Sequence, residues 1–185
     1  MPELVARVPR QGRLLEVGCG HGLFANACAL AWPALQVLGI DPAPAKVAAA
    51  AASVGGRGNV RFEQGHVESL REGGFDCAAI VDVLYLVPRA EWIPFLAACG
   101  KALVPGGRLL LKEVDVRPRW KFRRCVLQET LSVKLLGVTL GGGFAFAGRD
   151  EMRSVLEQAG FEGVVTTDLG RGDWTPHVLY EAVRR

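Results

Sequence analysis

The stretch Leu14-Leu15-Glu16-Val17-Gly18-Cys19-Gly20-His21-Gly22 decides the fold of this 185-residue chain. A short apolar run from Arg13 to Val17 leads into three glycines, each separated from the next by one residue. Glycine permits sharp turns and lets a ligand lie against bare peptide groups. A small-residue stretch from Leu23 to Ala31 follows and stops at Trp32-Pro33. The sequence therefore predicts a strand, a turn and a helix.

The same alternation continues along the chain as far as Glu113. Short apolar runs predict strands, and glycine or proline punctuates the stretches between them. The expected strands are Gln36–Ile40, Val60–Gln64, Cys77–Asp82 and Arg108–Glu113, and the expected helices are Pro44–Val54 and Arg89–Leu103. Alternating strands and helices with short connections predict a doubly wound α/β fold whose parallel sheet is covered on both faces.

The C-terminal part departs from this alternation. Arg149 to Ala159 predicts a helix, and two strands are expected at Val164–Asp168 and Val178–Val183. The connection between these strands is too short for a helical crossover, so they are expected to be antiparallel neighbours. We expect one domain over residues 1–185, with residues 114–148 forming an insertion that caps the acceptor site.

The expected cap carries a local excess of basic residues. Between Asp115 and Lys134 six Lys or Arg residues face two acids, and apolar residues recur at three- and four-residue steps. Gly141-Gly142-Gly143 followed by Phe144-Ala145-Phe146 is typical of a hinge beside aromatic side chains. Such a helix could meet an anionic or amphiphilic acceptor, or rest on a membrane surface as a peripheral contact. An ordinary amphipathic helix packed on the core is the alternative.

The composition excludes several classes of protein. The 22 Lys and Arg against 19 Asp and Glu leave a net charge of +3, too weak to indicate a nucleic-acid partner. The start of the chain does not resemble a secretory signal, and no run approaches a membrane span, so a cytoplasmic location is expected. The five cysteines form no Cys-x-x-Cys pair, which predicts reduced, packed thiols and no metal site. The oligomeric state stays open.

The glycine turn and two acids indicate the kind of ligand. A dinucleotide fingerprint needs its third glycine at position 23, but that residue is Leu23 and the glycine falls at Gly22. Asp41, at the end of the second strand, can accept hydrogen bonds from both ribose hydroxyls, or can cap the next helix. Glu16 would repel a pyrophosphate but suits an amino group, unless it pairs with a nearby Arg. The expected ligand is an adenosine that carries a cationic amine.

These motifs together resemble the class I S-adenosylmethionine-dependent methyltransferases, and the resemblance covers most of the chain. Glu16-x-Gly18-x-Gly20-x-Gly22 is similar to their first motif, and Gly39-Ile40-Asp41 to their ribose-binding acid. Phe75-Asp76 resembles the entry to their fourth strand, and Leu103-Val104-Pro105-Gly106-Gly107-Arg108-Leu109 the turn into their fifth. The family's fold is a seven-stranded sheet, mostly parallel, with an antiparallel last strand.

The resemblance also implies a cofactor site for S-adenosyl-L-methionine. Where the family often places an Asp to hold the adenine amine, this chain has Gly65-His66-Val67, and a neutral His can accept the same hydrogen bond. The residues expected to contact the cofactor are Glu16, Gly18, Cys19, Gly20, Gly22, Asp41, Pro42, His66, Val67 and Asp82.

Catalysis of methyl transfer requires alignment of the reactants and a base only if the acceptor must lose a proton. Candidate residues at the strand ends are Asp82, Tyr85, Glu113, Asp115 and the more remote His177, each with an alternative role as a surface or pairing residue. The segment Asp82-Val83-Leu84-Tyr85 lacks the prolines of the family's adenine methylases, which argues against a nucleic-acid acceptor. A nucleophilic role for Cys19 is not expected.

The leading hypothesis is an S-adenosylmethionine-dependent methyltransferase that acts on a small or lipid-like molecule. A non-catalytic S-adenosylmethionine-binding protein or subunit, which keeps the cofactor pocket but lacks an acceptor site, is the first alternative. An NAD-dependent oxidoreductase is the second, disfavoured by the glycine spacing.

Overall fold

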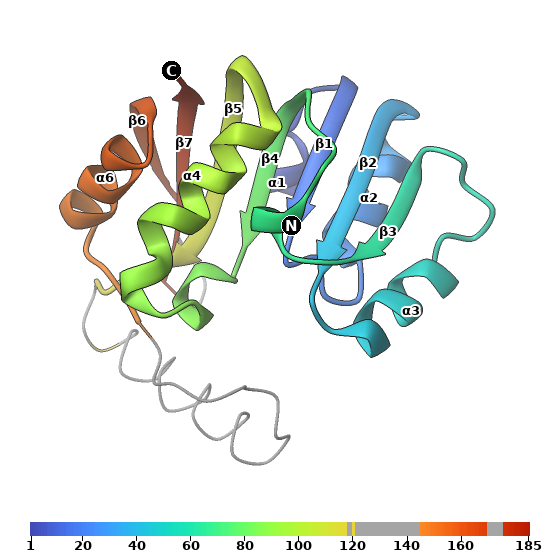
Figure 1. Ribbon diagram of the computed structural model, residues 1–185, viewed down its shortest axis with the longest axis horizontal. Helices are drawn as coiled ribbons and strands as arrows, with labels where there is room; N and C mark the ends of the chain where they lie inside the picture. Colours follow the sequence, from blue (N-terminus) through green and yellow to red (C-terminus); the bar gives the residue numbers. More distant parts are fainter. Residues whose placement is uncertain (118–119, 121–144, 170–175) are drawn as a thin grey trace.

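The computed structural model describes residues 1–117, 120, 145–169 and 176–185. Within them, seven strands form one sheet in the order β3-β2-β1-β4-β5-β7-β6 (Figure 1). The strands are β1 (Gln11–Val17), β2 (Ala34–Asp41), β3 (Val60–Gln64), β4 (Phe75–Val81), β5 (Leu103–Val114), β6 (Phe161–Asp168) and β7 (His177–Arg184). β1 to β5 pair in parallel, and β7 is antiparallel to β5 and to β6. The predicted fold class is confirmed.

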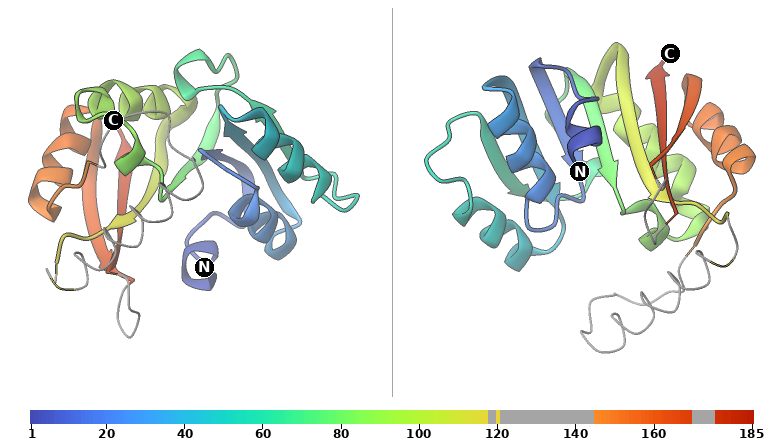
Figure 2. Two further views of the ribbon diagram at one scale, coloured as in Figure 1. Left: turned by 90° about the horizontal axis from the view of Figure 1, so that it is seen from below. Right: turned by 180° about the vertical axis from the view of Figure 1, so that it is seen from behind.

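Helices cover both faces of the sheet (Figures 1 and 2). The α-helices are α1 (Pro2–Val5), α2 (Leu23–Ala31), α3 (Pro44–Ala52), α4 (Trp92–Ala102) and α6 (Arg149–Gln158), and the 3₁₀ turns are η1 (Val67–Ser69), η2 (Leu84–Leu86) and η3 (Arg89–Glu91). α1 and α2 pack on one face of the sheet, and α4 and α6 pack on the other.

The alternation of side chains along each strand explains this arrangement. Leu14 and Leu15 are both fully buried, although consecutive strand residues point to opposite faces. Leu14 joins the core under α1 and α2, whereas Leu15 joins the core under α4 and α6. An apolar run without polar interruption is what a strand buried on both faces requires.

Most predicted boundaries agree with the structure to within a few residues. Leu23–Ala31 and Val60–Gln64 match fully. The helix expected from Arg89 begins instead as a 3₁₀ turn and becomes α4 at Trp92, with Pro94 in its first turn, where proline is tolerated. α1 was not expected, because four residues are too few to show a helical period.

The predicted cap falls mostly on residues that the structure does not describe. Its basic helix and triple glycine lie outside the described residues, so both stay predictions. Ala145, Phe146 and Ala147, at its C-terminal end, are described and lie beside η2 and α6. Among the helices of the described ranges, none is long and apolar enough to cross a membrane.

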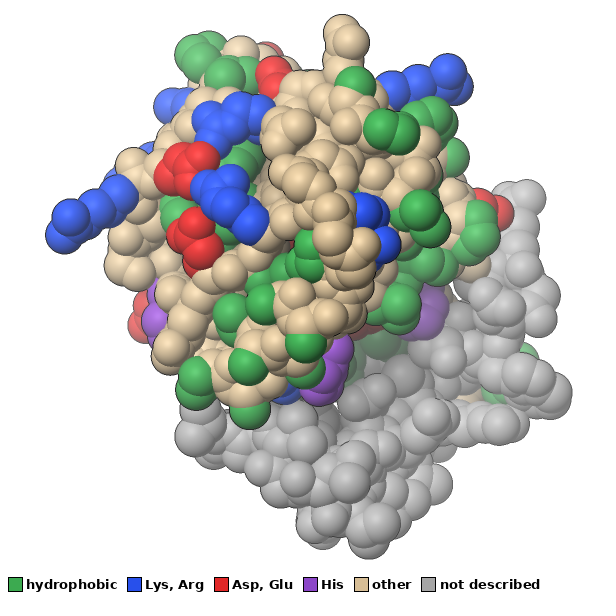
Figure 3. Space-filling model, turned by 90° about the vertical axis from the view of Figure 1, so that its right-hand side faces the viewer, with side chains coloured by type: hydrophobic (Ala, Val, Ile, Leu, Met, Phe, Trp, Pro, Cys, Tyr) green, Lys and Arg blue, Asp and Glu red, His purple; other side chains and the backbone are tan. Residues whose placement is uncertain are grey.

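The β3 edge of the sheet carries charges of both signs. On the face shown in Figure 3, basic and acidic side chains lie beside one another. Arg61 on β3 forms ion pairs with Glu63 and Glu72, and Glu72 also pairs with Arg13. These pairs are partly exposed, and such pairs each contribute only about 0–1 kcal/mol to stability.

Candidate functional site

The glycine turn between β1 and α2 is held to the end of β2 by backbone hydrogen bonds. The N–H groups of Gly18 and Cys19 both donate to the carbonyl of Ile40, at 2.8 and 2.9 Å. Gly22 then donates to the carbonyl of Cys19 at 2.8 Å, which closes the turn before α2 begins. These bonds place the glycine turn directly beside the carboxyl end of β2, where Asp41 lies.

All three glycines of the motif adopt a left-handed backbone, but they differ in their surroundings. A Cβ at Gly18 would lie 2.6 Å from Val83 Cγ2, and one at Gly22 would lie 2.5 Å from the Phe62 ring. A Cβ at Gly20 would meet no described atom within 4 Å. Gly18 and Gly22 are thus needed for packing, whereas Gly20 leaves bare backbone beside open space.

Asp41 joins this turn to the start of α3. Its Oδ2 accepts the N–H of Gly20 at 2.9 Å, and its Oδ1 accepts the N–H of Ala43 at 2.9 Å. The residue is buried. Each carboxylate oxygen still has acceptor capacity beyond one N–H, so the geometry leaves room for a further donor. A hydrogen bond to a ribose stays a prediction.

Glu16 lies on β1 beneath the first turn of α2. Its Oε2 accepts the N–H of Ala25 at 2.9 Å, and the residue is only 3% exposed. Burial raises the pKa of Glu16 to about 8, the Ala25 N–H lowers it, and the negative charge of Asp41 raises it further. No described arginine pairs with Glu16. A cation beside this carboxyl would favour its ionised form.

The cysteines of the described part are buried, free thiols, as predicted. Burial raises the pKa of Cys19 to about 12, and the nearby charges of Glu16 and Asp41 raise it further. A thiol with so high a pKa stays protonated at neutral pH and is a poor nucleophile. Cys125 lies outside the described residues.

The end of β3, just before the predicted cofactor residues His66 and Val67, is bonded to the backbone around Asp41. Gly65 donates its N–H to the carbonyl of Asp41 at 3.2 Å, and Gln64 Nε2 donates to the carbonyl of Pro42 at 3.3 Å. Val67 is buried in the core, whereas His66, just before it, is exposed. An adenine contact through His66 stays a prediction.

Asp82 lies at the carboxyl end of β4 in a left-handed conformation with φ of 57°. Its Oδ2 forms an ion pair with Lys112, and His177 Nε2 lies 3.9 Å from its Oδ1. Within the described part, that Oδ1 has no hydrogen-bond partner although it is buried. A non-glycine residue in this conformation is strained, and such strain is common at functional sites.

Glu113, near the carboxyl end of β5, lies close enough to Asp82 for their charges to interact. Its Oε1 accepts the N–H of Leu84 at 2.7 Å and that of Val83 at 3.2 Å, at the start of η2. The residue is 5% exposed. Burial raises the pKa of Glu113 to about 8, the two N–H groups and Lys112 lower it, and the negative charge of Asp82 raises it.

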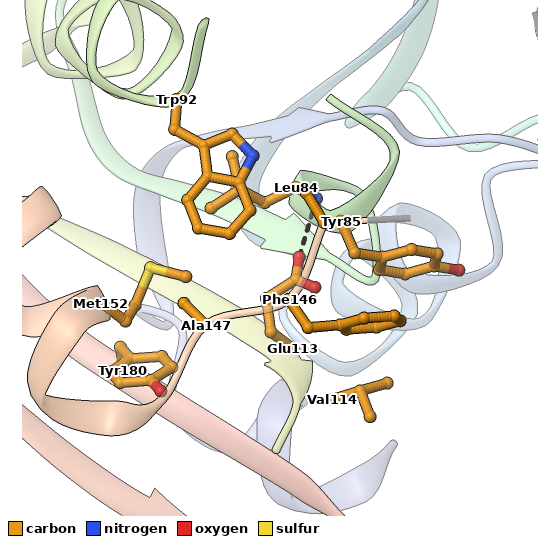
Figure 4. A pocket seen from close by; sticks show the side chains of 10 residues that line it. Leu84, Tyr85, Trp92, Glu113, Val114, Phe146, Ala147, Met152 and Tyr180 are labelled. Carbon is orange, nitrogen blue, oxygen red and sulfur yellow. Dashed lines mark hydrogen bonds between the residues drawn. The ribbon is translucent and has the colours of Figure 1, made fainter. Parts of the chain in front are cut away.

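Glu113 lines a pocket between η2, α4, α6 and the strand ends (Figure 4). Tyr85 and Phe146, both in its lining, stack with ring centroids 5.7 Å apart and planes 12° apart. The pocket is lined by Leu84, Tyr85, Trp92, Glu113, Val114, Ala145, Phe146, Ala147, Met152 and Tyr180. Apart from Glu113, its lining is aromatic or aliphatic.

Asp115 has a different environment, although it lies only two residues farther along the chain. Arg149 Nε donates to its Oδ2 at 2.7 Å, and the N–H of Arg117 donates to its Oδ1 at 3.1 Å. The side chain is 3% exposed. Asp115 thereby ties the end of β5 to the start of α6, a structural contact that occupies both carboxylate oxygens.

The predicted site residues thus fall into two groups. The glycine motif, Glu16, Asp41 and Pro42 gather at the ends of β1 and β2, while Asp82, Tyr85 and Glu113 gather at the ends of β4 and β5. His177 approaches Asp82 and does not line the pocket. Sequence inspection missed Trp92, Met152 and Tyr180, because apolar and aromatic residues far apart in the chain give no local signal of a shared pocket.

Comparison with known proteins identifies the fold and the family. A family model described as "Methyltransferase domain" matches residues 1–166. The chain is 26% identical over 166 residues to a ubiquinone biosynthesis O-methyltransferase of Cereibacter sphaeroides, which covers 88% of this chain and 65% of the relative. It therefore spans about two thirds of the length of that relative.

Solved structures give the same result. The apo S-adenosylmethionine-dependent methyltransferase SibL matches with a TM-score of 0.75 and 27% identity, over 99% of this chain and 54% of that one. An S-adenosylmethionine-dependent methyltransferase of Mesorhizobium loti matches with a TM-score of 0.74 and 18% identity, over 99% and 96% of the two chains. The second match shows the fold alone.

Proposed function

This chain belongs to the class I S-adenosylmethionine-dependent methyltransferases, and on that premise we propose that it transfers the methyl group of S-adenosyl-L-methionine to a small-molecule acceptor. The O-methyltransferase names of the curated relatives support an oxygen nucleophile. We propose that the acceptor is a small or lipid-like molecule and that the protein is cytoplasmic.

The observation that carries the proposal is the combination of bare backbone and acids at the glycine turn. Among the residues that the structure describes, none lies within 4 Å of a Cβ built on Gly20, so a ligand can approach its peptide group. Asp41 lies directly beside this backbone, bonded to the Gly20 N–H at 2.9 Å. The Asp41 carboxylate accepts hydrogen bonds, and beside an exposed peptide group it suits the hydroxyl groups of a ribose.

Glu16 distinguishes this ligand from a dinucleotide. The two buried carboxyls Glu16 and Asp41 lie close together. The negative charge of Asp41 raises the pKa of Glu16, and the charges of both raise the pKa of Cys19. Such a site disfavours the negative charges of a pyrophosphate and favours a cationic amine. The residues present therefore fit S-adenosylmethionine, whose sulfonium supplies an activated methyl group when it is bound.

The chain's own contribution is positioning, since methyl transfer in line depends on the alignment of the two reactants. The hydrogen bonds from Gly18 and Cys19 to Ile40 hold the turn in one geometry. On the acceptor side, the aromatic and aliphatic side chains around Glu113 offer an apolar surface on which an acceptor can pack.

Methyl transfer from S-adenosylmethionine labelled in its methyl group tests the proposal. The protein is incubated with a small-molecule extract, and labelled products are separated by size and charge. Label in a small organic product supports an enzyme. Tight binding of S-adenosylmethionine without any labelled product would favour a binding protein, and binding of NAD with hydride transfer would favour an oxidoreductase.

A further inference from the structure

The pocket around Glu113 has the features of an acceptor site. Apart from the Glu113 carboxyl, its lining consists of aromatic and aliphatic side chains, so it suits an apolar or aromatic group. The nearly parallel rings of Tyr85 and Phe146 form a flat aromatic wall on one side of it. Flat rings favour offset stacking on a wall of this kind.

The two carboxyl oxygens of Glu113 have different surroundings. Oε1 accepts the N–H groups of Val83 and Leu84. Figure 4 shows the other carboxyl oxygen turned toward the side of the pocket where Tyr85 and Phe146 lie. One oxygen therefore anchors the side chain to the backbone, and the other faces the place where an acceptor ring would stack.

Fixing the η2 backbone does not by itself require an acid. An amide oxygen could accept the same two N–H groups, and burial of a neutral amide costs less free energy than burial of a carboxyl that ionises. Glu113 is nonetheless a carboxyl, 5% exposed, in an apolar pocket. The structure thus retains a group that can take up a proton at a site where only a hydrogen-bond acceptor is needed for folding.

Val83 links this pocket to the glycine turn. Its N–H donates to Glu113, and its side chain fills the space in which a Cβ at Gly18 would lie, at 2.6 Å. The donor turn and the acceptor pocket are therefore separated by one residue. An acceptor atom held beside Glu113 lies next to the side of the fold that we assign to the methyl donor.

We propose that Glu113 takes the proton from a hydroxyl group of a flat, aromatic acceptor that stacks against Tyr85 and Phe146. The inference rests on the proposed function. In the step, an oxygen lone pair forms the bond to the methyl carbon while the sulfur–carbon bond breaks and its electrons stay on sulfur. The hydroxyl proton moves to Glu113, and its bonding electrons stay on the acceptor oxygen, so the ether product is neutral.

Several charged and titratable groups surround Glu113. Asp82 on the β4 side raises its pKa, and Lys112 on β5 lowers it. Tyr180 on β7, whose own pKa burial raises well above the usual range, and Tyr85 on η2 also line the pocket. Since the pKa of Glu113 is about 8, the proton-accepting carboxylate form increases as pH rises through that value.

A pair of acceptors of different acidity separates base catalysis from a structural role. Catechol keeps its hydroxyl protons at neutral pH, whereas the nitro group of 4-nitrocatechol ionises one hydroxyl at mildly alkaline pH. Single-turnover methylation of both is measured at saturating S-adenosylmethionine for wild type, Glu113→Gln and the exposed control Glu91→Gln. Binding of 4-nitrocatechol is followed separately by its visible absorbance, in the presence of S-adenosylhomocysteine.

We expect Glu113→Gln to slow catechol methylation by about 100-fold or more, as loss of a general base does, while 4-nitrocatechol methylation at pH 9 falls by less than about 5-fold. The variant should bind 4-nitrocatechol and S-adenosylhomocysteine like wild type, because glutamine keeps the acceptor for Val83 and Leu84. Tyr85→Ala should weaken 4-nitrocatechol binding by roughly 3- to 10-fold. Glu91→Gln should change neither rate nor binding.

If Glu113→Gln slows the methylation of both acceptors equally, or does not slow catechol methylation, the proposed role of Glu113 is wrong. If the wild-type protein binds S-adenosylmethionine but binds neither catechol nor 4-nitrocatechol, the proposed acceptor class is wrong and the assignment of the methyl donor stands. Failure to bind S-adenosylmethionine would overturn the proposed function itself. If Glu113→Gln does not fold, the pH profile of wild type with catechol decides: a rate that is flat between pH 6 and 9 contradicts the proposal.

Discussion

Glu16 and Glu113 hold equivalent places in the two halves of the sheet. Each lies near the carboxyl end of a parallel strand, accepts backbone N–H from a helical turn at that edge of the sheet and is almost fully buried. The turn is α2, after β1, for Glu16 and η2, after β4, for Glu113. Burial raises the pKa of each to about 8. Backbone geometry alone therefore does not distinguish the two carboxyls.

Their surroundings do distinguish them. Glu16 lies near a second acid, Asp41, and beside the open backbone of Gly20, which suits a ligand with a positive charge and hydroxyl groups. Glu113 lies among aromatic and aliphatic side chains, which suits a flat, neutral acceptor. A raised pKa thus marks both halves of the site, and the neighbouring residues decide which chemistry each half performs.

The glycines of the donor half give the largest expected effect on stability. Gly22→Ala should lower the free energy of unfolding by about 2–5 kcal/mol, from left-handed strain plus overlap with Phe62 and Ala50. Gly20→Ala should cost only about 1–2 kcal/mol, since its Cβ meets open space. Chemical denaturation measures both.

The Gly20→Ala variant also separates folding from binding. It should remain folded yet bind S-adenosylmethionine more weakly, because the added methyl group fills the space assigned to the ligand. Equal stability losses at positions 20 and 22, or unchanged affinity in Gly20→Ala, would contradict the assignment of that space.

Removal of the Asp41 carboxylate should have the largest effect on donor affinity. Asp41→Ala removes two charge-assisted hydrogen bonds to the ligand and should weaken S-adenosylhomocysteine binding by about 2–4 kcal/mol. It also removes the acceptor for Gly20 and Ala43, so Asp41→Asn serves as the control that retains one oxygen. Unchanged affinity in Asp41→Ala would exclude the ribose contact.

The two glutamates predict how stability depends on pH. A carboxyl whose pKa is about 8 in the folded state and about 4.5 when unfolded binds its proton more tightly in the folded state. Stability contributed by that proton is present below pH 4.5 and is lost as pH rises through 8, by up to about 1.4 kcal/mol per pH unit for each group.

Glu16→Gln and Glu113→Gln should each reduce this pH slope between pH 5.5 and 8. The measurement is denaturant unfolding of the ligand-free protein at several pH values, compared with wild type. Slopes identical to wild type in both variants would mean that neither carboxyl holds its proton in the folded state.

Much of the donor half could be predicted from sequence, because its signals are local. The strand, the glycines and the helix start lie within about twenty consecutive residues, and only the distance to Asp41 spans a second strand. Apolar runs and glycine spacing reflect backbone requirements that do not depend on distant contacts. The motif residues accordingly meet in the structure as expected.

The acceptor half depends on tertiary contacts that sequence does not display. Glu113 and Asp115 were equal candidates, since both follow the same apolar run at a strand end. Only the fold shows that Arg149 neutralises Asp115 while Glu113 faces a pocket built from η2, α4, α6 and β7. The role of Val83 as the link between the halves likewise depends on packing against Gly18.

The smallest expected effect is the release of a fraction of a proton when the methyl donor binds. A cationic amine beside Glu16 lowers the pKa of that carboxyl, so binding of S-adenosylmethionine at pH 7 should release protons. Titration calorimetry in buffers of different ionisation enthalpy measures the release. Glu16→Gln should abolish it, and Glu113→Gln should retain it. Equal release in both variants would break the distinction between the two carboxyls.

The most direct test of the account is a calorimetric titration of the wild-type protein with S-adenosylmethionine, S-adenosylhomocysteine and NAD. We predict saturable binding of the first two at one site per chain and no binding of NAD, because the acids at the glycine turn oppose a pyrophosphate. Binding of NAD as tight as that of S-adenosylmethionine, or no binding of S-adenosylmethionine at all, would contradict the assignment of the glycine turn as a methyl-donor site.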